Sequence, residues 1–166
     1  MKKIEIDKIT LNIGTGEPGD KLEKAMKLLN AITNEHSVAT KAKKRIPTWG
    51  IRPGLSIGCK VTLRKEKAKL VLARLLKGVG NKLTTRKFDK FGNFSFGIKD
   101  YVEIPETKYY PDIGVIGLEV AVTLKRPGYR VKSRLLKQTS IGKKHAITKD
   151  DAMKFVIETF GTEVTG

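Results

Sequence analysis

The motif in this sequence that most resembles part of an enzyme is a glycine-rich turn. Residues Gly14–Gly19 (GTGEPG) match the G-x-G-x-x-G pattern that holds a pyrophosphate in dinucleotide-binding enzymes. The preceding residues, Ile4–Ile13, alternate between apolar and polar side chains, whereas the first strand of such an enzyme is buried on both faces and reads as a continuous apolar run. Glu17 would also place a carboxylate beside the pyrophosphate. We therefore interpret the motif as a turn that leads into a helix.

The other reactive or metal-binding side chains do not suggest a site. His36 and His145 are far apart and have no cysteine or acid at ligand spacing. The single cysteine, Cys59, falls on the apolar side of an alternating stretch, where a buried and inert thiol is expected. Asp150 and Asp151 are best explained as acids at the start of a helix, where negative charge is favourable. The sequence predicts no catalytic residue, no metal and no cofactor, and so no enzyme.

The charge distribution points instead to a polyanionic partner. The 166 residues include 34 Lys and Arg and 17 Asp and Glu, for a formal net charge of +17. Residues 41–69 contribute +9 and residues 125–144 contribute +8, so the remainder of the chain is neutral. Two cationic segments on a neutral body are typical of a protein that binds nucleic-acid phosphates. Neither segment carries a basic amphipathic helix or a lipidation motif, so a membrane partner is not expected.

Length and composition indicate a soluble, intracellular protein with a core. Hydrophobic residues make up 39% of the chain, and no run approaches the roughly 18 apolar residues that a membrane span needs. Glu5 and Asp7 interrupt the N-terminus, which therefore does not resemble a signal peptide. We expect one domain over residues 1–166, with a projecting loop at 46–56 and a basic extension at 125–147.

Side-chain periodicity predicts the elements that would position these charges. Alternation predicts strands over Ile4–Ile13, Val38–Arg45, Ile57–Leu63 and Leu118–Lys125, with short strands or a hairpin within 84–104. Helical spacing predicts helices over about 20–33 and 66–79 and a short last helix, with Asp20 and Thr148 as N-caps. This order predicts an α+β fold of the split β-α-β (RRM or ferredoxin-like) type, with helices on one face of an antiparallel sheet. The other face would be open and would show Lys60, Thr62 and Arg64, together with Thr10 and Asn12.

Four phenylalanines precede the last predicted strand. Phe88, Phe91, Phe94 and Phe96 weakly resemble the aromatic strand with which RRM domains stack on RNA bases. Aromatic residues at such spacing are more often part of a core, and no second RRM motif accompanies them. We therefore assign no base stacking to these residues.

Several motifs together resemble the universal L5 family of large-subunit ribosomal proteins. They are LNIGTGEPGD, TKAKKR, IRPGLSIGCKVTLR and FDKFGNFSFGI, in the order of that family. The stretches RPGYRVKSR and IGKKHAITKDDA resemble its archaeal and eukaryotic branch. The resemblance implies a cytoplasmic, ribosome-bound structural protein that binds 5S rRNA in the central protuberance. It also implies contact with large-subunit rRNA, P-site tRNA, a neighbouring 5S-binding protein and, across an intersubunit bridge, a protein of the small-subunit head.

The resemblance also assigns residues to these contacts. The expected rRNA contacts are Lys8, Thr10, Asn12, Thr40, Lys41, Lys43, Lys60, Thr62, Arg64, Arg126, Arg130, Lys132 and Arg134. The expected tRNA-contacting loop consists of Pro47, Thr48, Trp49, Gly50, Ile51, Arg52, Pro53 and Gly54. Glu35 stands where many members have Gln, and a carboxylate there would repel phosphate. The alternatives are a non-ribosomal RNA chaperone or RNA-binding module, and a nucleotide-dependent enzyme that uses the Gly14–Gly19 turn.

Overall fold

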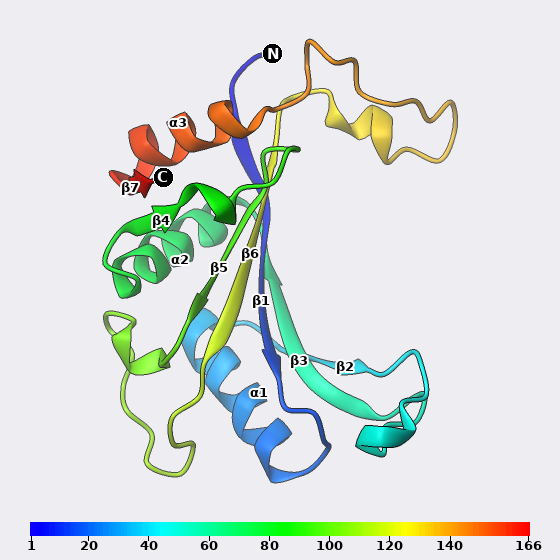
Figure 1. Ribbon diagram of the computed structural model, residues 1–166, viewed down its shortest axis with the longest axis vertical. Helices are drawn as coiled ribbons and strands as arrows, with labels where there is room; N and C mark the ends of the chain where they lie inside the picture. The colour runs from blue at the N-terminus through cyan, green and yellow to red at the C-terminus, as the bar shows by residue number, and fades with distance from the viewer. The chain divides into compact units, whose positions relative to one another are not determined.

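The computed structural model describes all 166 residues and has a mixed α+β architecture (Figure 1). In chain order the elements are β1 (Glu5–Gly14), α1 (Asp20–Thr33), β2 (Val38–Lys41), β3 (Ser56–Leu63), α2 (Lys65–Gly78), β4 (Lys82–Thr84), β5 (Phe94–Ile98), β6 (Leu118–Lys125), α3 (Lys149–Phe160) and β7 (Glu163–Thr165). Five strands form a mostly antiparallel sheet in the order β2-β3-β1-β6-β5, and β4 pairs with β7 in a small parallel sheet. The predicted α+β class is confirmed.

The chain divides into two compact units. Unit 1 comprises Met1–Ile9, Arg64–Phe96 and Ala121–Gly166, and unit 2 comprises Thr10–Leu63 and Gly97–Val120. The boundaries between them fall within strands β1, β5 and β6 and at the end of β3. No helix of either unit is long and apolar enough to cross a membrane.

Unit 2 is built around helix α1 and the β2–β3 hairpin. The helix buries one apolar face and packs against β3. Its buried residues include Leu22, Ala25, Leu28, Leu29 and Ile32. The helix has the predicted bounds, but the predicted N-cap at Asp20 is wrong. Gly19 is the N-cap, with a φ of 121° that favours glycine, and its carbonyl accepts the N–H groups of Leu22 and Glu23.

Strand β2 is shorter than the predicted Val38–Arg45 because its pairing with β3 is interrupted. Thr40 pairs with Gly58 and Lys41 pairs with Ser56, so Ile57 is left without a partner on β2. The carbonyl of Ile57 instead accepts the N–H groups of Thr15 and Gly16, each at 3.0 Å. The turn after β1 is thereby fixed to β3.

Unit 1 contains α2, α3 and the β4–β7 pair. Helix α2 buries Ala68, Val71, Leu72, Leu75 and Leu76, as its apolar stripe predicted. Helix α3 begins with the predicted cap, in which Thr148 and Asp151 form a reciprocal capping box. Strands β4 and β7 have only three residues each and were not predicted.

The strands of the larger sheet bury alternate side chains. Within β3, Cys59, Val61 and Leu63 are buried, whereas Lys60 and Thr62 are exposed. The other strands follow the same rule with Ile9, Leu11 and Ile13 on β1, Phe94, Phe96 and Ile98 on β5, and Leu118, Val120, Val122 and Leu124 on β6. Each strand therefore presents one apolar and one accessible row.

Candidate nucleic-acid interface

The accessible row of unit 2 gathers predicted contact residues from three strands. Lys60 and Thr62 on β3 are exposed, and Thr10 and Asn12 on β1 are half-buried between core residues. Thr40 on β2 pairs with Gly58 and is half-buried. A Cβ atom on Gly58 would lie only 3.1 Å from the Thr40 hydroxyl, so the missing side chain makes room for that hydroxyl beside β3. Hydroxyl, amide and ammonium groups in one row can contact RNA sugars and phosphates.

An acid that the sequence reasoning missed lies in the same row. The Asn12 side-chain amide Nδ2 donates to Glu119 Oε2 at 3.3 Å. This bond occupies the donor end of Asn12 and leaves its Oδ1 as the free acceptor. Glu119 belongs to the exposed half of the alternating β6 sequence, which was the available signal for its position.

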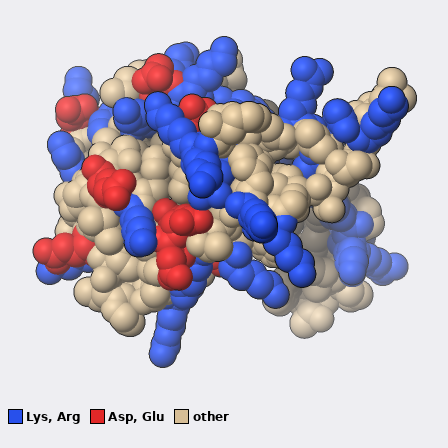
Figure 2. Space-filling view, turned by 90° about the horizontal axis from the view of Figure 1, so that it is seen from above, with Lys and Arg blue, Asp and Glu red and all other residues tan.

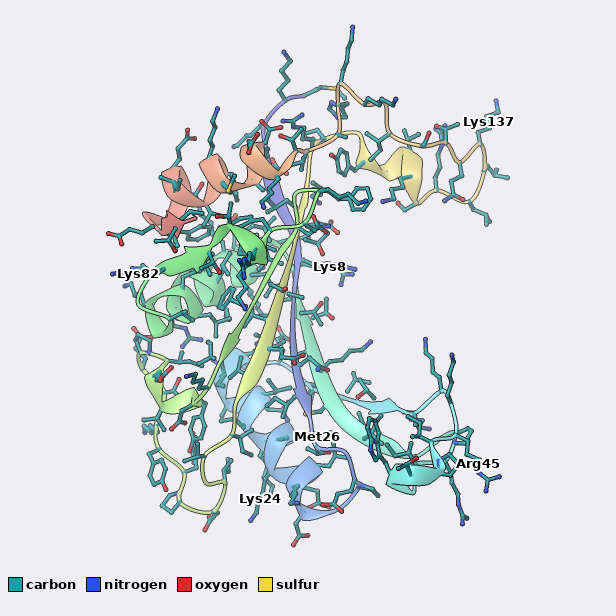
Figure 3. All side chains as sticks on the ribbon, viewed as in Figure 1. Lys8, Lys24, Met26, Arg45, Lys82 and Lys137 are labelled. Atoms are coloured by element: carbon teal, nitrogen blue, oxygen red, sulfur yellow. The ribbon has the colours of Figure 1, made fainter.

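Unit 1 carries two further predicted contacts next to its strands. Lys8 is half-buried on β1 and its side chain points away from the strand (Figure 3). Arg64 is exposed in extended backbone at the N-cap of α2. Nearby charge is partly neutralised, because Lys125 Nζ lies 3.3 Å from Asp7 Oδ1. The count of positive charges in the sequence therefore overstates the charge that is free to meet phosphate.

The loop at the end of the β2–β3 hairpin has a defined backbone. Ile46 and Ile51 exchange two backbone hydrogen bonds of 2.9 and 3.1 Å around the short 3-10 turn Pro47–Trp49. Ile51 is 6% exposed, whereas Trp49 is 72% exposed. The predicted tRNA-contacting loop is thus anchored by Ile51 and presents Trp49 and Arg52 to solvent.

Basic side chains continue along the hairpin before this loop. Lys41 at the end of β2 is exposed, as is Lys43 two residues later. Ala42 between them is buried and exchanges backbone hydrogen bonds with the returning strand, to Leu55 at 2.8 Å and from Gly54 at 3.0 Å. Arg45 extends outward from this part of the hairpin (Figure 3). The alternation keeps the cations on the accessible side.

The basic extension at 126–147 is held by contacts of its own. The Tyr129 hydroxyl accepts the Ile147 N–H at 2.9 Å and donates to the His145 carbonyl. The His145 ring nitrogen Nε2 lies 2.9 Å from the Pro127 carbonyl, and its ring meets that of Tyr129 edge-on. These bonds close the two ends of the extension on each other.

Arg126 differs from the other predicted contacts because its guanidinium is engaged inside unit 1. Its Nη2 donates to Asp151 Oδ2 at 3.0 Å, and its Nη1 lies 3.3 Å from the carbonyls of His145 and Ala146. The hydrogen bond from the Thr148 backbone, and with it Arg126, holds the pKa of Asp151 below its usual value. In the free protein Arg126 joins the extension to α3.

The outer part of the extension presents only positive charge. Arg130, Lys132 and Arg134 are all exposed. In Figure 2 this part of the molecule, on the right of the view, shows blue Lys and Arg side chains and no red acid. Its backbone is ordered by bonds such as that from the Arg134 N–H to the Arg130 carbonyl, at 2.9 Å. The segment has the charge and the defined shape needed to follow a phosphate backbone.

Comparison with known proteins decides the family. The model described as "Ribosomal protein L5" matches residues 1–52, and the model for the C-terminus of the same ribosomal family matches residues 56–155. The chain belongs to the ribosomal protein L5 family. Proteins called "Large ribosomal subunit protein uL5" are 49% identical in Nanoarchaeum equitans, with 99% of this chain and 97% of the relative covered, and 44% identical in Nitrosopumilus maritimus, with 99% and 95% covered.

Membership in the L5 family confirms the recognition made from the sequence motifs. A ribosomal protein is a structural part of a ribonucleoprotein and not an enzyme, and its partners are ribosomal RNA and other ribosomal proteins. The relatives named above are archaeal, in agreement with the branch that the C-terminal motifs indicated.

The Gly14–Gly19 turn has a structural role in this L5-family chain. The N–H groups of Thr15 and Gly16 are bonded to the Ile57 carbonyl, so they do not form the open cradle that a pyrophosphate requires. Glu17 Oε1 pairs with Lys21 Nζ at 2.8 Å, an exposed pair that lowers the pKa of Glu17. The turn connects β1 to α1 and fixes both to β3.

Cys59 lies in the core of unit 2. Its side chain is fully buried on the apolar side of β3, and burial raises the pKa of its thiol to about 11. A thiol with this pKa holds almost no thiolate at neutral pH, and the thiolate is the nucleophile. Cys59 therefore contributes packing below the accessible row of Lys60 and Thr62.

Proposed function

We propose that this L5-family protein is a structural protein of the large ribosomal subunit that binds 5S rRNA and helps attach it in the central protuberance. The observation that carries the proposal is the accessible row on β1, β2 and β3. It combines the Lys60 ammonium with the uncharged side chains of Thr10, Asn12, Thr40 and Thr62 on a rigid set of strands. Lys8 and Arg64 add positive charge in unit 1.

This mixture of groups suits the backbone of a folded RNA. Lysine and arginine neutralise phosphates, and hydroxyl and amide groups fix the register through sugar and phosphate oxygens. A row of this kind recognises the shape of an RNA more than its sequence. The closeness of archaeal relatives named as large-subunit proteins supports the assignment to that subunit.

The remaining parts of the proposal concern other partners. The extension, through Arg130, Lys132 and Arg134, would bind further large-subunit rRNA. The loop Pro47–Gly54 would contact P-site tRNA, and Trp49 is its most accessible large side chain. Contacts with a neighbouring 5S-binding protein and with a small-subunit head protein complete the proposed set of partners.

Filter binding to 5S rRNA tests the principal proposal. Charged hydrogen bonds are typically worth about 1.5–3 kcal/mol, so Lys60→Ala with Arg64→Ala should weaken binding by at least about tenfold. The matched control is Lys24→Ala with Lys27→Ala, which removes two cations from α1. Equal affinity for the two double variants would show that the strand row is not the binding surface.

The tRNA part needs a variant that spares the buried anchor. Trp49→Ala with Arg52→Ala alters exposed side chains and leaves Ile51 in place. We expect 5S rRNA binding to stay within about twofold of wild type, because these residues lie outside the strand row. P-site tRNA affinity of ribosomes carrying the variant should fall. Unchanged tRNA affinity would remove the loop from the proposed contacts.

A further inference from the structure

One phenylalanine of the FDKFGNFSF stretch lies outside the core. Phe88, Phe94 and Phe96 are buried, with ring centroids 5.1 Å apart for the first pair and 6.4 Å for the second. Phe91 is 69% exposed. An isolated exposed aromatic ring in a protein that otherwise buries its phenylalanines calls for a partner outside the chain.

The turn that carries Phe91 is preorganised. Asp89 Oδ1 accepts the N–H groups of Phe91 at 2.9 Å and of Asn93 at 2.8 Å, and Asp89 Oδ2 accepts from the Asn93 side chain at 3.0 Å. Gly92 has a φ of 78°, and a Cβ atom there would lie 2.4 Å from Ile147 Cγ2. The turn is thus fixed against a buried isoleucine, and little entropy is lost when a ligand meets the ring.

The surroundings of Phe91 are cationic. Arg86, Lys87 and Lys90 are exposed, and Lys90 Nζ lies 5.9 Å from the centre of the Phe91 ring. Asp89 is the only acid in residues 85–93, and its carboxylate is engaged by the three N–H donors of the turn. A ligand at this point would meet a flat apolar ring with positive charge around it.

We propose that Phe91 stacks on an unpaired nucleobase of ribosomal RNA, with Lys87 and Lys90 beside the flanking phosphates. The proposal rests on the RNA-binding function above but assigns a separate site on unit 1. Residues 85–93 present no second exposed apolar side chain, so the turn lacks the apolar patch that a protein partner would need. A single aromatic ring among cations is how proteins hold a base of single-stranded RNA.

The test compares Phe91→Leu, which keeps an apolar side chain, with Phe91→Trp, which keeps a stacking ring. Each is titrated with cognate 5S rRNA and with the single-stranded octamer of adenylate. Loss of one base stack should weaken binding of Phe91→Leu to at least one of these RNAs by about 5- to 150-fold, with an unchanged salt dependence. Phe91→Trp should bind as well as wild type or better. Tyr109→Leu, at a residue 56% exposed in unit 2, is the matched control and should leave both affinities unchanged.

Tryptophan fluorescence supplies an independent readout. Trp49 is the only tryptophan, so Trp49→Phe with Phe91→Trp places the single fluorophore in the turn. Stacking on a base should quench its emission when RNA is added.

Three results would overturn the inference: equal affinity of Phe91→Leu and wild type for both RNAs, an equal loss in Phe91→Leu and Phe91→Trp, or unquenched fluorescence on RNA binding. If Phe91→Leu lost a ribosomal protein partner while keeping both RNA affinities, the contact would be a protein contact and the inference would also fail. If wild type bound the octamer through Phe91 but did not bind 5S rRNA, the proposed function would fail and this site would stand.

Discussion

Replacing Gly58 with alanine tests whether the close approach of β1, β2 and β3 is required for the fold. A Cβ atom at this position would lie 2.7 Å from the Ile13 carbonyl oxygen, 3.1 Å from the Thr40 hydroxyl and 3.3 Å from the Gly14 Cα. Two of these three atoms are backbone, so relief requires that β1 moves away from β3. Overpacking of this kind costs about 1–3 kcal/mol.

The expected effect is measurable by thermal unfolding. In a chain of this size each kcal/mol lowers the Tm by about 2–4 °C, so Gly58→Ala should unfold about 2–12 °C below wild type. The displaced strands carry Lys60, Thr40 and Asn12, and 5S rRNA binding should weaken as well. Circular dichroism melts and filter binding provide the two measurements.

The matched control is Gly97→Ala in β5, where the nearest atom to the new Cβ is 4.0 Å away. That substitution should be neutral or should raise the Tm, because alanine reduces the freedom of the unfolded chain. An unchanged Tm for Gly58→Ala would refute the close-approach argument. An equal fall for Gly97→Ala would show that any side chain added to a strand glycine is harmful here.

Three further predictions follow from individual contacts. Glu119→Gln keeps an acceptor for Asn12 but removes a negative charge from the strand row; two charges about 7 Å apart in water interact by about 0.6 kcal/mol, so 5S rRNA should bind about two- to threefold more tightly, and unchanged or weaker binding in filter assays would contradict this. Asp151→Asn should remove the part of the stability that its lowered pKa provides, which is present above the unfolded pKa of about 3.9 and lost as pH falls through the folded value; urea titrations of both proteins should therefore differ most near neutral pH and converge in acid, and parallel curves would contradict the linkage. Cys59 should resist Ellman's reagent in the native protein and react at once in guanidinium, whereas rapid reaction without denaturant would show that the core around it opens.

Regular periodicity made most elements predictable. The apolar positions of α1, from Leu22 to Ile32, recur at helical spacing, and the helix has the predicted bounds. Strict alternation did the same for β3 and β6. In these segments local sequence and tertiary burial agree, so a pattern along the chain is sufficient.

The errors arose where distant backbone decides. The Ile57 carbonyl bonds to Thr15 and Gly16, and this removes it from the β2–β3 pairing and ends β2 early. The three-residue strands β4 and β7 pair across about 80 residues of chain, and neither has enough residues to show a period. No local signal reports such pairings.

The candidate site was predictable by position but not by chemistry. Alternation placed Thr10, Asn12, Lys60 and Thr62 on accessible rows, where the structure has them. It did not reveal that Glu119 binds Asn12, since the two residues are 107 positions apart. It also did not reveal that Arg126 is used to hold α3 and the extension together. Side-chain partners distant in sequence require the three-dimensional structure.

Crosslinking of the native complex with 5S rRNA, read out by mass spectrometry, tests the central proposal most directly. Ultraviolet light joins RNA to side chains in contact with it, so the modified peptides identify the surface that the RNA covers. We predict crosslinks to 5S rRNA within residues 8–12, 40–43 and 60–64. Crosslinks confined to the outer surfaces of α1 and α2, with the strand rows unmodified, would contradict the proposal.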